Sequence, residues 1–195
     1  FKVGQLDGKM TAYYDNGQMR EERTFKGGNG KWITYYDNGQ LREKRNFKVG
    51  QLNGEIISYY NNGQIKKEGN YKDGERDSTW TFYYDNGQLE KDANYKDGEK
   101  VDKWTYYNEN GSKDGLWTYD NENDDKDGKW TWYHVDGQIR KERNLIEGKR
   151  DGKWLTYHEN GSIKGEGNFI EGKLDGKMTY YYENGQIKEE FAYND

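Results

Sequence analysis

Two histidines, His134 and His158, are the side chains of this chain that could serve as a histidine base or bind a metal through an imidazole. The 195 residues include no cysteine, which excludes thiol catalysis, thiolate metal sites and disulfide bonds. Each histidine occupies a place where related segments carry Tyr36, Tyr60 or Tyr182, so one semi-polar ring replaces another. No set of nucleophile, base and orienting residue can be proposed. The sequence predicts that the protein is not an enzyme and has no catalytic residue.

The acidic stretch 120–128 has the composition of a calcium-binding loop. Asn123, Asp125, Asp127 and Gly128 fit the start of an EF-hand loop in part, because such a loop alternates oxygen ligands before a glycine. Position 123 lacks a charge, and His134 stands where the loop needs a glutamate. We interpret the stretch as a solvated turn, with calcium as the alternative, and we expect no metal and no cofactor.

The composition indicates a folded chain with a thin core. Hydrophobic residues make up 30% and charged residues 34% of the chain, yet there are 7 Trp, 19 Tyr and 6 Phe. Aromatic side chains bury large areas, so few residues carry most of the apolar surface. The formal net charge of −5 provides no basic excess for nucleic acid or an anionic membrane. We therefore expect neither nucleic-acid binding nor direct membrane binding.

A segment of about 24 residues recurs along the whole chain. One slot of the segment holds tryptophan or another apolar residue, and its successive positions are 22, 24, 24, 24, 26, 24 and 24 residues apart. These positions are Met10, Trp32, Ile56, Trp80, Trp104, Trp130, Trp154 and Met178. The spacing predicts one array, residues 1–195, of about eight units.

Each unit has the pattern of a β-hairpin. A strand rich in tryptophan, threonine and tyrosine leads to an Asn-Gly turn, such as Asn62-Gly63 or Asn86-Gly87, and a second strand follows. Asn-Gly is a strong hairpin signal because both residues tolerate a positive φ. Loops of the Lys-Asp-Gly type then lead to the next unit, and no helix follows them that could form a phosphate site. Proline, which cannot donate to a sheet ladder, is absent.

The alternation of side chains along a strand assigns the aromatic residues to two faces. One face carries a structural tyrosine column: Tyr13, Tyr35, Tyr59, Tyr83, Tyr107, Tyr133, Tyr157 and Tyr181. The other face carries a candidate binding surface: Trp32, Trp80, Phe82, Trp104, Tyr106, Trp130, Trp132 and Trp154. These rings either stabilise a sheet that little else covers, which we favour, or form a platform for a ligand. Charged residues at fixed slots of the second strands predict cross-strand ion pairs.

The pattern is degenerate at residues 104–130, where the expected second strand is missing. We predict that the segment Leu116–Asp120 forms a strand of the first type in its place. The chain starts and stops within a unit, because residues 1–8 resemble residues 47–54 and residues 193–195 resemble residues 71–73. This phase suggests a fragment of a longer array.

Residues 151–164, Asp-Gly-Lys-Trp-Leu-Thr-Tyr-His-Glu-Asn-Gly-Ser-Ile-Lys, resemble the MORN repeat variant of bacterial repeat proteins. The resemblance extends over essentially the whole chain. It implies an all-β fold: an elongated single-layer antiparallel sheet of stacked β-hairpin repeats, solenoid-like and twisted or trough-shaped. Some relatives are described as antitoxin-like and others resemble surface proteins of anaerobic bacteria. The composition is similar to that of a low-GC bacterium.

Repetition without a catalytic constellation favours a non-catalytic scaffold that mediates protein–protein interaction. One alternative is cell-surface carbohydrate or cell-wall binding through the aromatic columns. Another is self-assembly into filaments, because exposed strand edges at the two ends could pair end to end. The expected partner is a protein, and a glycan is the alternative. We favour a cell-surface or secreted location over a cytoplasmic one.

Overall fold

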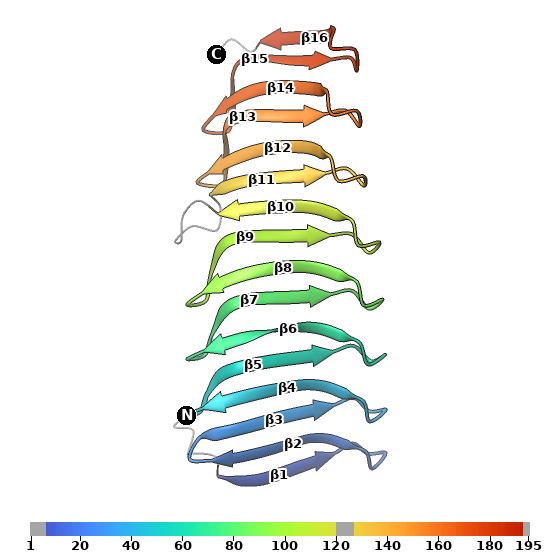
Figure 1. Cartoon of the computed structure of the whole chain (residues 1–195). Coiled ribbons are helices and arrows are strands. Elements are labelled where there is room, and N and C mark those ends of the chain that lie inside the picture. Colours follow the sequence, from blue (N-terminus) through green and yellow to red (C-terminus); the bar gives the residue numbers. More distant parts are fainter. Residues whose placement is uncertain (1–6, 120–126, 193–195) are drawn as a thin grey trace. The chain divides into compact units, whose positions relative to one another are not determined.

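The computed structural model describes residues 7–119 and 127–192. These residues form strands and turns. No helix that could cross a membrane is found among them. The strands follow one another in sequence order in an open antiparallel sheet of successive hairpins (Figure 1). The predicted fold class, an all-β antiparallel sheet of hairpin repeats, is confirmed. By its internal contacts the chain divides into two larger parts, each made of several hairpin repeats. From here on these parts are called the first unit, Phe1–Gly98, and the second unit, Glu99–Asp195.

Each unit contains eight strands, and within a unit every strand pairs with the next one in sequence. The first unit contains β1 (Gly8–Tyr13), β2 (Met19–Lys26), β3 (Asn29–Tyr35), β4 (Leu41–Lys48), β5 (Gln51–Tyr59), β6 (Ile65–Lys72), β7 (Glu75–Tyr83) and β8 (Leu89–Lys96). The second unit contains β9 (Glu99–Tyr107), β10 (Lys113–Tyr119), β11 (Gly128–Tyr133), β12 (Ile139–Ile146), β13 (Lys149–Tyr157), β14 (Ile163–Ile170), β15 (Lys173–Tyr181) and β16 (Ile187–Ala192).

The Asn-Gly turns form as predicted, although only the glycine takes the positive φ that both residues tolerate. In the turn between β5 and β6 only Gly63 does, at 86°. The Tyr60 amide donates to the Gln64 carbonyl at 2.8 Å, and the Gly63 amide donates to the Tyr60 carbonyl at 3.0 Å. The Asn62 side chain accepts from the Gln64 amide at 3.0 Å, which holds the asparagine out of the left-handed region. The turn is therefore longer than a two-residue hairpin and ends in a bulge at the glycine.

Two-residue turns with positive φ at both positions lie at the opposite ends of the strands. In the loop between β6 and β7, Asp73 has a φ of 51° and Gly74 a φ of 92°. This is the primed turn that matches the twist of the flanking strands, and aspartate is one of the few non-glycine residues that tolerate it. The Lys-Asp-Gly loops are thus tight hairpin turns.

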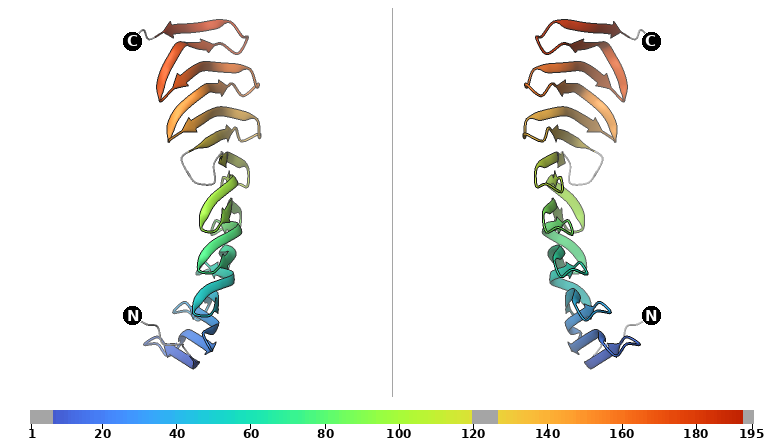
Figure 2. Two further views of the ribbon diagram at one scale, coloured as in Figure 1. Left: turned by 90° about the vertical axis from the view of Figure 1, so that its left-hand side faces the viewer. Right: turned by 90° about the vertical axis from the view of Figure 1, so that its right-hand side faces the viewer.

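The first strand of several hairpins contains a bulge that bends it. Ser78 in β7 has a φ of 62°, and the pairing of β6 with β7 shifts register between Glu68 and Asn70. Gly54, Gly152 and Gly176 take a positive φ at the corresponding places in β5, β13 and β15. A bulge adds a residue to one strand, so that strand curves, as the side views show for the strands of each unit (Figure 2).

The curvature creates a small core on one face of a single-layer sheet. Trp80 in β7 is fully buried, although no second layer covers it. The ring centroids of Tyr71 and Tyr95 lie 5.1 and 6.3 Å from that of the indole, both in edge-on arrangements. In the neighbouring β6, Gly69 leaves the space that the indole fills, because a Cβ there would be 2.4 Å from Trp80 Cδ2. The thin aromatic core predicted from composition is built in this way.

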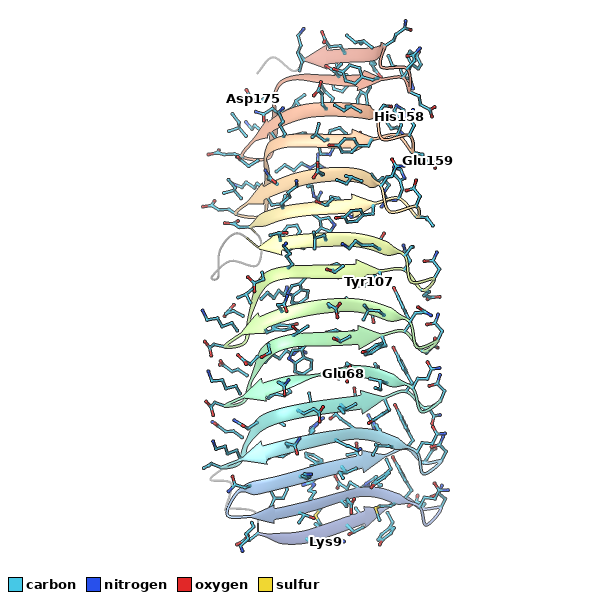
Figure 3. All side chains as sticks on the ribbon, viewed as in Figure 1. Lys9, Glu68, Tyr107, His158, Glu159 and Asp175 are labelled. Carbon is cyan, nitrogen blue, oxygen red and sulfur yellow. The ribbon has the colours of Figure 1, made fainter. Side chains whose placement is uncertain are left out.

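Aromatic side chains beside the Asn-Gly turns tie each hairpin to the next. The hydroxyls of Tyr14, Tyr36 and Tyr60 donate to main-chain carbonyls in the following hairpin at 2.7–2.8 Å. His134 and His158 take the same slot in the second unit, with Nε2 3.4 and 3.0 Å from the carbonyls of Tyr157 and Tyr181. Figure 3 shows His158 at the turn end of its strand. The interpretation that histidine replaces tyrosine is thus supported by a shared contact.

The degenerate segment forms the predicted extra strand. β10 contains residues 116–119 of the predicted Leu116–Asp120 strand, while Asp120 lies outside the described residues. Trp117 lies opposite Trp104 in β9 and Trp130 in β11. The antiparallel order therefore continues through residues 104–130.

Candidate functional site

We name the two sides of the sheet after their aromatic rows. The tyrosine face carries the predicted tyrosine column, and the tryptophan face carries the eight residues of the candidate binding surface together with the side chains that contact them. Along β7, for example, Trp80 and Phe82 belong to the tryptophan face, while Thr81 and Tyr83 belong to the tyrosine face. The two faces differ in how their polar groups are satisfied.

On the tyrosine face, tyrosine hydroxyls donate to glutamates of the preceding strand. The pairs are Tyr35–Glu22 at 3.0 Å, Tyr83–Glu68 at 2.7 Å, Tyr157–Glu142 at 3.0 Å and Tyr181–Glu166 at 2.6 Å. Burial, and then the bond to Glu68, raises the pKa of Tyr83 to about 12. A phenol held in this way stays protonated at neutral pH, so these tyrosines are not poised for proton transfer.

The glutamates of the tyrosine face also form cross-strand ion pairs, as predicted. Lys129 lies 2.5 Å from Glu142, and Lys177 lies 2.7 Å from Glu190. Of the tyrosine column, Tyr13 is 59% exposed, and the other seven side chains are half-buried. At least four of the eight column tyrosines therefore bind glutamates within the sheet, as do two lysines, which fits the structural role expected for the column.

The tryptophan face of the first unit combines aromatic rings with cations. The Arg23 guanidinium lies 3.9 Å from the centre of the Trp32 ring, and that of Arg45 lies 5.1 Å from it. Arg76 approaches Trp80 at 4.7 Å, and Lys91 approaches Phe82 at 4.4 Å. Cations over ring faces are attracted by the ring quadrupole, most strongly where water is excluded. Glu21 and Glu43 neutralise part of this charge through ion pairs with Arg23 and Arg45.

In the second unit the aromatic rings of the same face form a continuous stack. The Trp130 ring lies 5.6 Å from that of Tyr106 and 5.0 Å from that of Trp132, in stacked arrangements, and Trp117 meets it edge-on at 4.8 Å. Gly115 in β10 makes room for Trp130, since a Cβ there would lie 3.2 Å from its Nε1. A stack of this kind is a rigid apolar surface.

A group of cations surrounds this stack. Lys141 Nζ lies 5.1 Å from the centre of the Trp132 ring and 5.8 Å from that of Trp154, while the Arg143 guanidinium lies 4.8 Å from Trp132. Burial, and then Arg143 and other nearby arginines, lowers the pKa of Lys141. Burial, and then Arg150, lowers the pKa of Arg143. These cations repel one another, and where residues are described none of the three forms an ion pair.

A hollow of about 550 Å³ opens beside these cations on the tryptophan face. Its lining residues include Trp132, Trp154, Tyr180, Lys141 and Thr156. Gly165 in β14 lets the ring of Tyr180, which lines the hollow, lie close to that strand, because a Cβ there would lie 2.9 Å from the ring. The hollow is lined by aromatic rings and by cationic groups. Surfaces that bind anions or sugars have this combination of side chains.

The candidate binding surface divides by burial. Trp80 and Trp104 are 0% and 5% exposed, so their rings serve as core. The other six are half-buried and reach the surface: Trp32, Phe82, Tyr106, Trp130, Trp132 and Trp154. The sequence interpretation did not include Trp117, Lys141, Arg143 and Arg150. A comparison of the three second strands that carry an arginine at this position would have revealed the cations. Glutamate stands two residues before Arg23 and Arg45, whereas lysine stands two residues before Arg143.

No group of metal-ligating side chains is found among the described residues. The stretch considered for calcium lies outside them for residues 120–126. Within the described part, Asp127 accepts from the Glu147 amide, so its carboxylate joins two neighbouring loops.

A family model described as MORN repeat variant matches the chain seven times, at residues 6–26, 29–48, 52–73, 76–97, 126–146, 150–171 and 174–195. The interval without a match, 98–125, contains β10 and most of the degenerate segment. No curated protein sequence matches the chain significantly. Repeats of this family are generally associated with scaffolds that bind proteins or membranes, and the family is generally non-catalytic.

Proposed function

Because the chain belongs to the MORN repeat variant family, we propose that it is a non-catalytic scaffold that binds a protein partner on the tryptophan face of its second unit. The observation that carries this proposal is the group formed by Lys141, Arg143 and Arg150 beside half-exposed Trp132 and Trp154. Tryptophan and arginine are the residues that most often dominate binding energy at protein interfaces.

The two faces differ in what they could offer a partner. On the tyrosine face, phenols already donate to glutamates and lysines already form ion pairs. On the tryptophan face of the second unit, Lys141, Arg143 and Arg150 lie over aromatic rings and form no ion pair with the described residues. A partner that covers this face gains both apolar burial and charge pairing, whereas one on the other face must break existing contacts.

Site-specific photo-crosslinking tests the proposal in cells that make the protein. A photoreactive amino acid at Thr156 would lie in the hollow of the tryptophan face, and one at Lys153, in the same strand β13, would lie on the tyrosine face. We expect a defined protein adduct from position 156 and none from position 153. Adducts of equal yield from both positions, or none from either, would contradict the proposed face.

A glycan partner is the second candidate, supported by the hollow between Trp132, Trp154 and Tyr180. Aromatic rings stack on the apolar faces of sugars, and Thr156 adds a hydroxyl at the same place. A glycan array probed with the chain and with a Trp132→Ala variant tests this alternative. Binding that the variant loses would support it, while an array without signal would leave the protein scaffold.

A further inference from the structure

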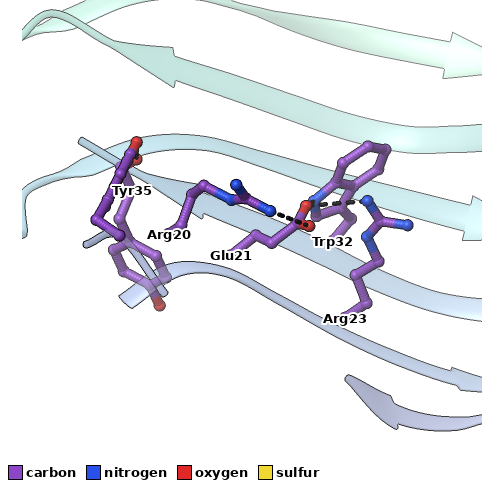
Figure 4. A network of polar contacts seen from close by, with 6 residues as sticks. Arg20, Glu21, Arg23, Trp32 and Tyr35 are labelled. Atoms are coloured by element: carbon purple, nitrogen blue, oxygen red, sulfur yellow. Dashed lines mark hydrogen bonds and ion pairs between the residues drawn. The ribbon is translucent and has the colours of Figure 1, made fainter. Parts of the chain in front are cut away.

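The first unit shows how the tryptophan face holds a carboxylate. Glu21 in β2 accepts from Arg23 Nη2 at 3.0 Å and from Trp32 Nε1 at 2.8 Å, both through its Oε2 atom (Figure 4). Arg23 lies opposite Trp32 in β3, and Glu21 lies opposite Thr34. One carboxylate thus satisfies an arginine and an indole on neighbouring strands. Glu21 is only 9% exposed, so this arrangement is built into the sheet.

The second unit repeats the register of this arrangement without its carboxylate, and the Arg143 guanidinium lies over Trp132. Arg143 in β12 lies opposite Trp154 in β13, as Arg23 lies opposite Trp32. Lys141 lies opposite Thr156, in the slot that Glu21 occupies opposite Thr34. The charge of one slot is therefore reversed, while the arginine and the tryptophan that bind the carboxylate remain.

The groups left without the carboxylate are not satisfied elsewhere in the described chain. Arg143 Nε is buried and has no hydrogen-bond partner there, and the same holds for Arg23 Nε in the first unit. Arg23, however, binds Glu21 through Nη2, whereas no ion pair of Arg143 is found among the described residues. The Trp154 indole also has no acceptor among the described residues, and its side chain is half-buried at the edge of the hollow. A buried donor without an acceptor, such as Arg143 Nε, costs free energy, which an incoming acceptor recovers.

We propose that the Lys141–Arg143–Trp154 cluster binds an aspartate or glutamate side chain of the partner protein, in an acidic segment that lies along the hollow. The inference rests on the proposed function, because it specifies which partner the tryptophan face takes. Two observations support a side-chain carboxylate. An arginine opposite a tryptophan binds a glutamate in the first unit, and Lys141 adds a positive charge in the slot where Glu21 and Glu43 carry a negative one beside an arginine. Rings of Trp132 and Tyr180 would contact apolar residues beside the acid.

The test measures binding of labelled synthetic peptides to the full chain by fluorescence anisotropy. One peptide alternates glutamate with leucine and serine, and its control carries glutamine in place of each glutamate. We expect the glutamate peptide to bind at least about tenfold more tightly, and its affinity to fall as salt is raised. A sulfated oligosaccharide serves as a third probe, for an anionic glycan.

A charge reversal in the cluster provides the decisive variant. Lys141→Glu places a carboxylate two residues before Arg143, as Glu21 precedes Arg23, so the chain would fill its own site. We expect peptide affinity to fall about tenfold or more, while the unfolding midpoint is unchanged or rises by about 2–4 °C. Lys153→Glu makes the same change of charge on the tyrosine face, and we expect affinity to stay within about twofold.

Each other outcome overturns the inference. Equal affinity for the glutamate and glutamine peptides, or no binding of either, excludes a carboxylate site. Equal losses in the two variants mean that only overall charge matters. Binding of the sulfated oligosaccharide without the peptide assigns the cluster to a glycan. If Thr156 still crosslinks a protein in any of these cases, the scaffold function stands and only the acidic partner is rejected.

Discussion

Replacing Gly69 by alanine tests whether the indole of Trp80 fills the space over β6. Gly69 does not have a positive φ, so its backbone suits any residue, and alanine in a strand is otherwise favoured over glycine by roughly 0.5–1 kcal/mol. The added Cβ, however, would lie 2.4 Å from Trp80 Cδ2. The indole is rigid, fully buried and in contact with Tyr71, so it cannot move without disturbing the core.

Overpacking of this kind costs about 1–3 kcal/mol, so we expect Gly69→Ala to lower the free energy of unfolding by about 1–2 kcal/mol. Gly167 in β14 provides the matched control, because it occupies the corresponding slot in the second unit. There the new Cβ would meet Met178 Cε at 2.7 Å, the end of a flexible side chain that can move aside. We expect the free energy of unfolding of Gly167→Ala to change by less than about 1 kcal/mol.

Urea unfolding followed by circular dichroism measures both variants. We expect a lower midpoint for Gly69→Ala with an unchanged dependence on urea concentration. An unchanged or raised stability of Gly69→Ala would refute the packing of Trp80 against β6. A loss in Gly167→Ala equal to that in Gly69→Ala would show that glycine is needed at this slot for another reason.

Three further predictions follow from the turns and the tyrosine face. Tyr60→Phe removes the hydroxyl that donates to the Tyr83 carbonyl at 2.8 Å, so we expect urea unfolding to show a loss of about 0.5–1.5 kcal/mol; no loss would mean that the bridge adds nothing. Gly63→Ala places a side chain at a φ of 86°, and a loss of about 1 kcal/mol in the same assay is expected, while a gain would contradict the turn geometry. The Tyr83 pKa is about 12 in the folded chain, against an ordinary 10.0, so the folded state binds more protons between these values. Stability should therefore fall as pH rises from about 10 to about 12, and less in Tyr83→Phe; equal pH dependence of the two proteins would contradict the raised pKa.

The period of the sequence was enough to predict the hairpins and the tyrosine column. Both depend on local rules, because side chains alternate along a strand and an Asn-Gly pair favours a turn. The bond from Tyr83 to Glu68 confirms that these two residues share a face, as the alternation requires. The contact shared by His134 and the turn tyrosines likewise follows from the slot that it occupies.

The burial of Trp80 could not be predicted in the same way. It depends on Gly69 in the neighbouring strand and on a bulge at Ser78, a residue that does not favour a positive φ. The Asn-Gly pairs predicted the turns but not their backbone geometry, because the Asn62 side chain accepts from the Gln64 amide and only Gly63 has a positive φ. The burial of Trp80 depends on contacts between strands, and the turn geometry depends on a bond from a side chain to the main chain. Neither kind of contact can be recognised from the sequence of one repeat.

The cations of the second unit were missed for another reason. The formal net charge of −5 describes the whole chain and hides a local excess of positive charge. The slot of Lys141 holds Glu21 and Glu43 in β2 and β4, where an arginine follows two residues later, and Lys67 and Lys91 in β6 and β8, where none does. Aligning the second strands slot by slot, in addition to the first strands, would have brought the cluster into the sequence interpretation.

The turn-to-turn bridges determine how the length of such a protein can change. The Tyr36 hydroxyl donates to the Tyr59 carbonyl in the following hairpin, and the Tyr60 hydroxyl donates to that of Tyr83. A deletion of residues 37–60 would join Tyr36 to Asn61 and bring its hydroxyl to the Tyr83 carbonyl that Tyr60 now contacts. The junction would be equivalent to the original. Genetic recombination between repeats could therefore shorten or extend the protein by whole 24-residue repeats, with the same turn-to-turn hydrogen bond at each junction.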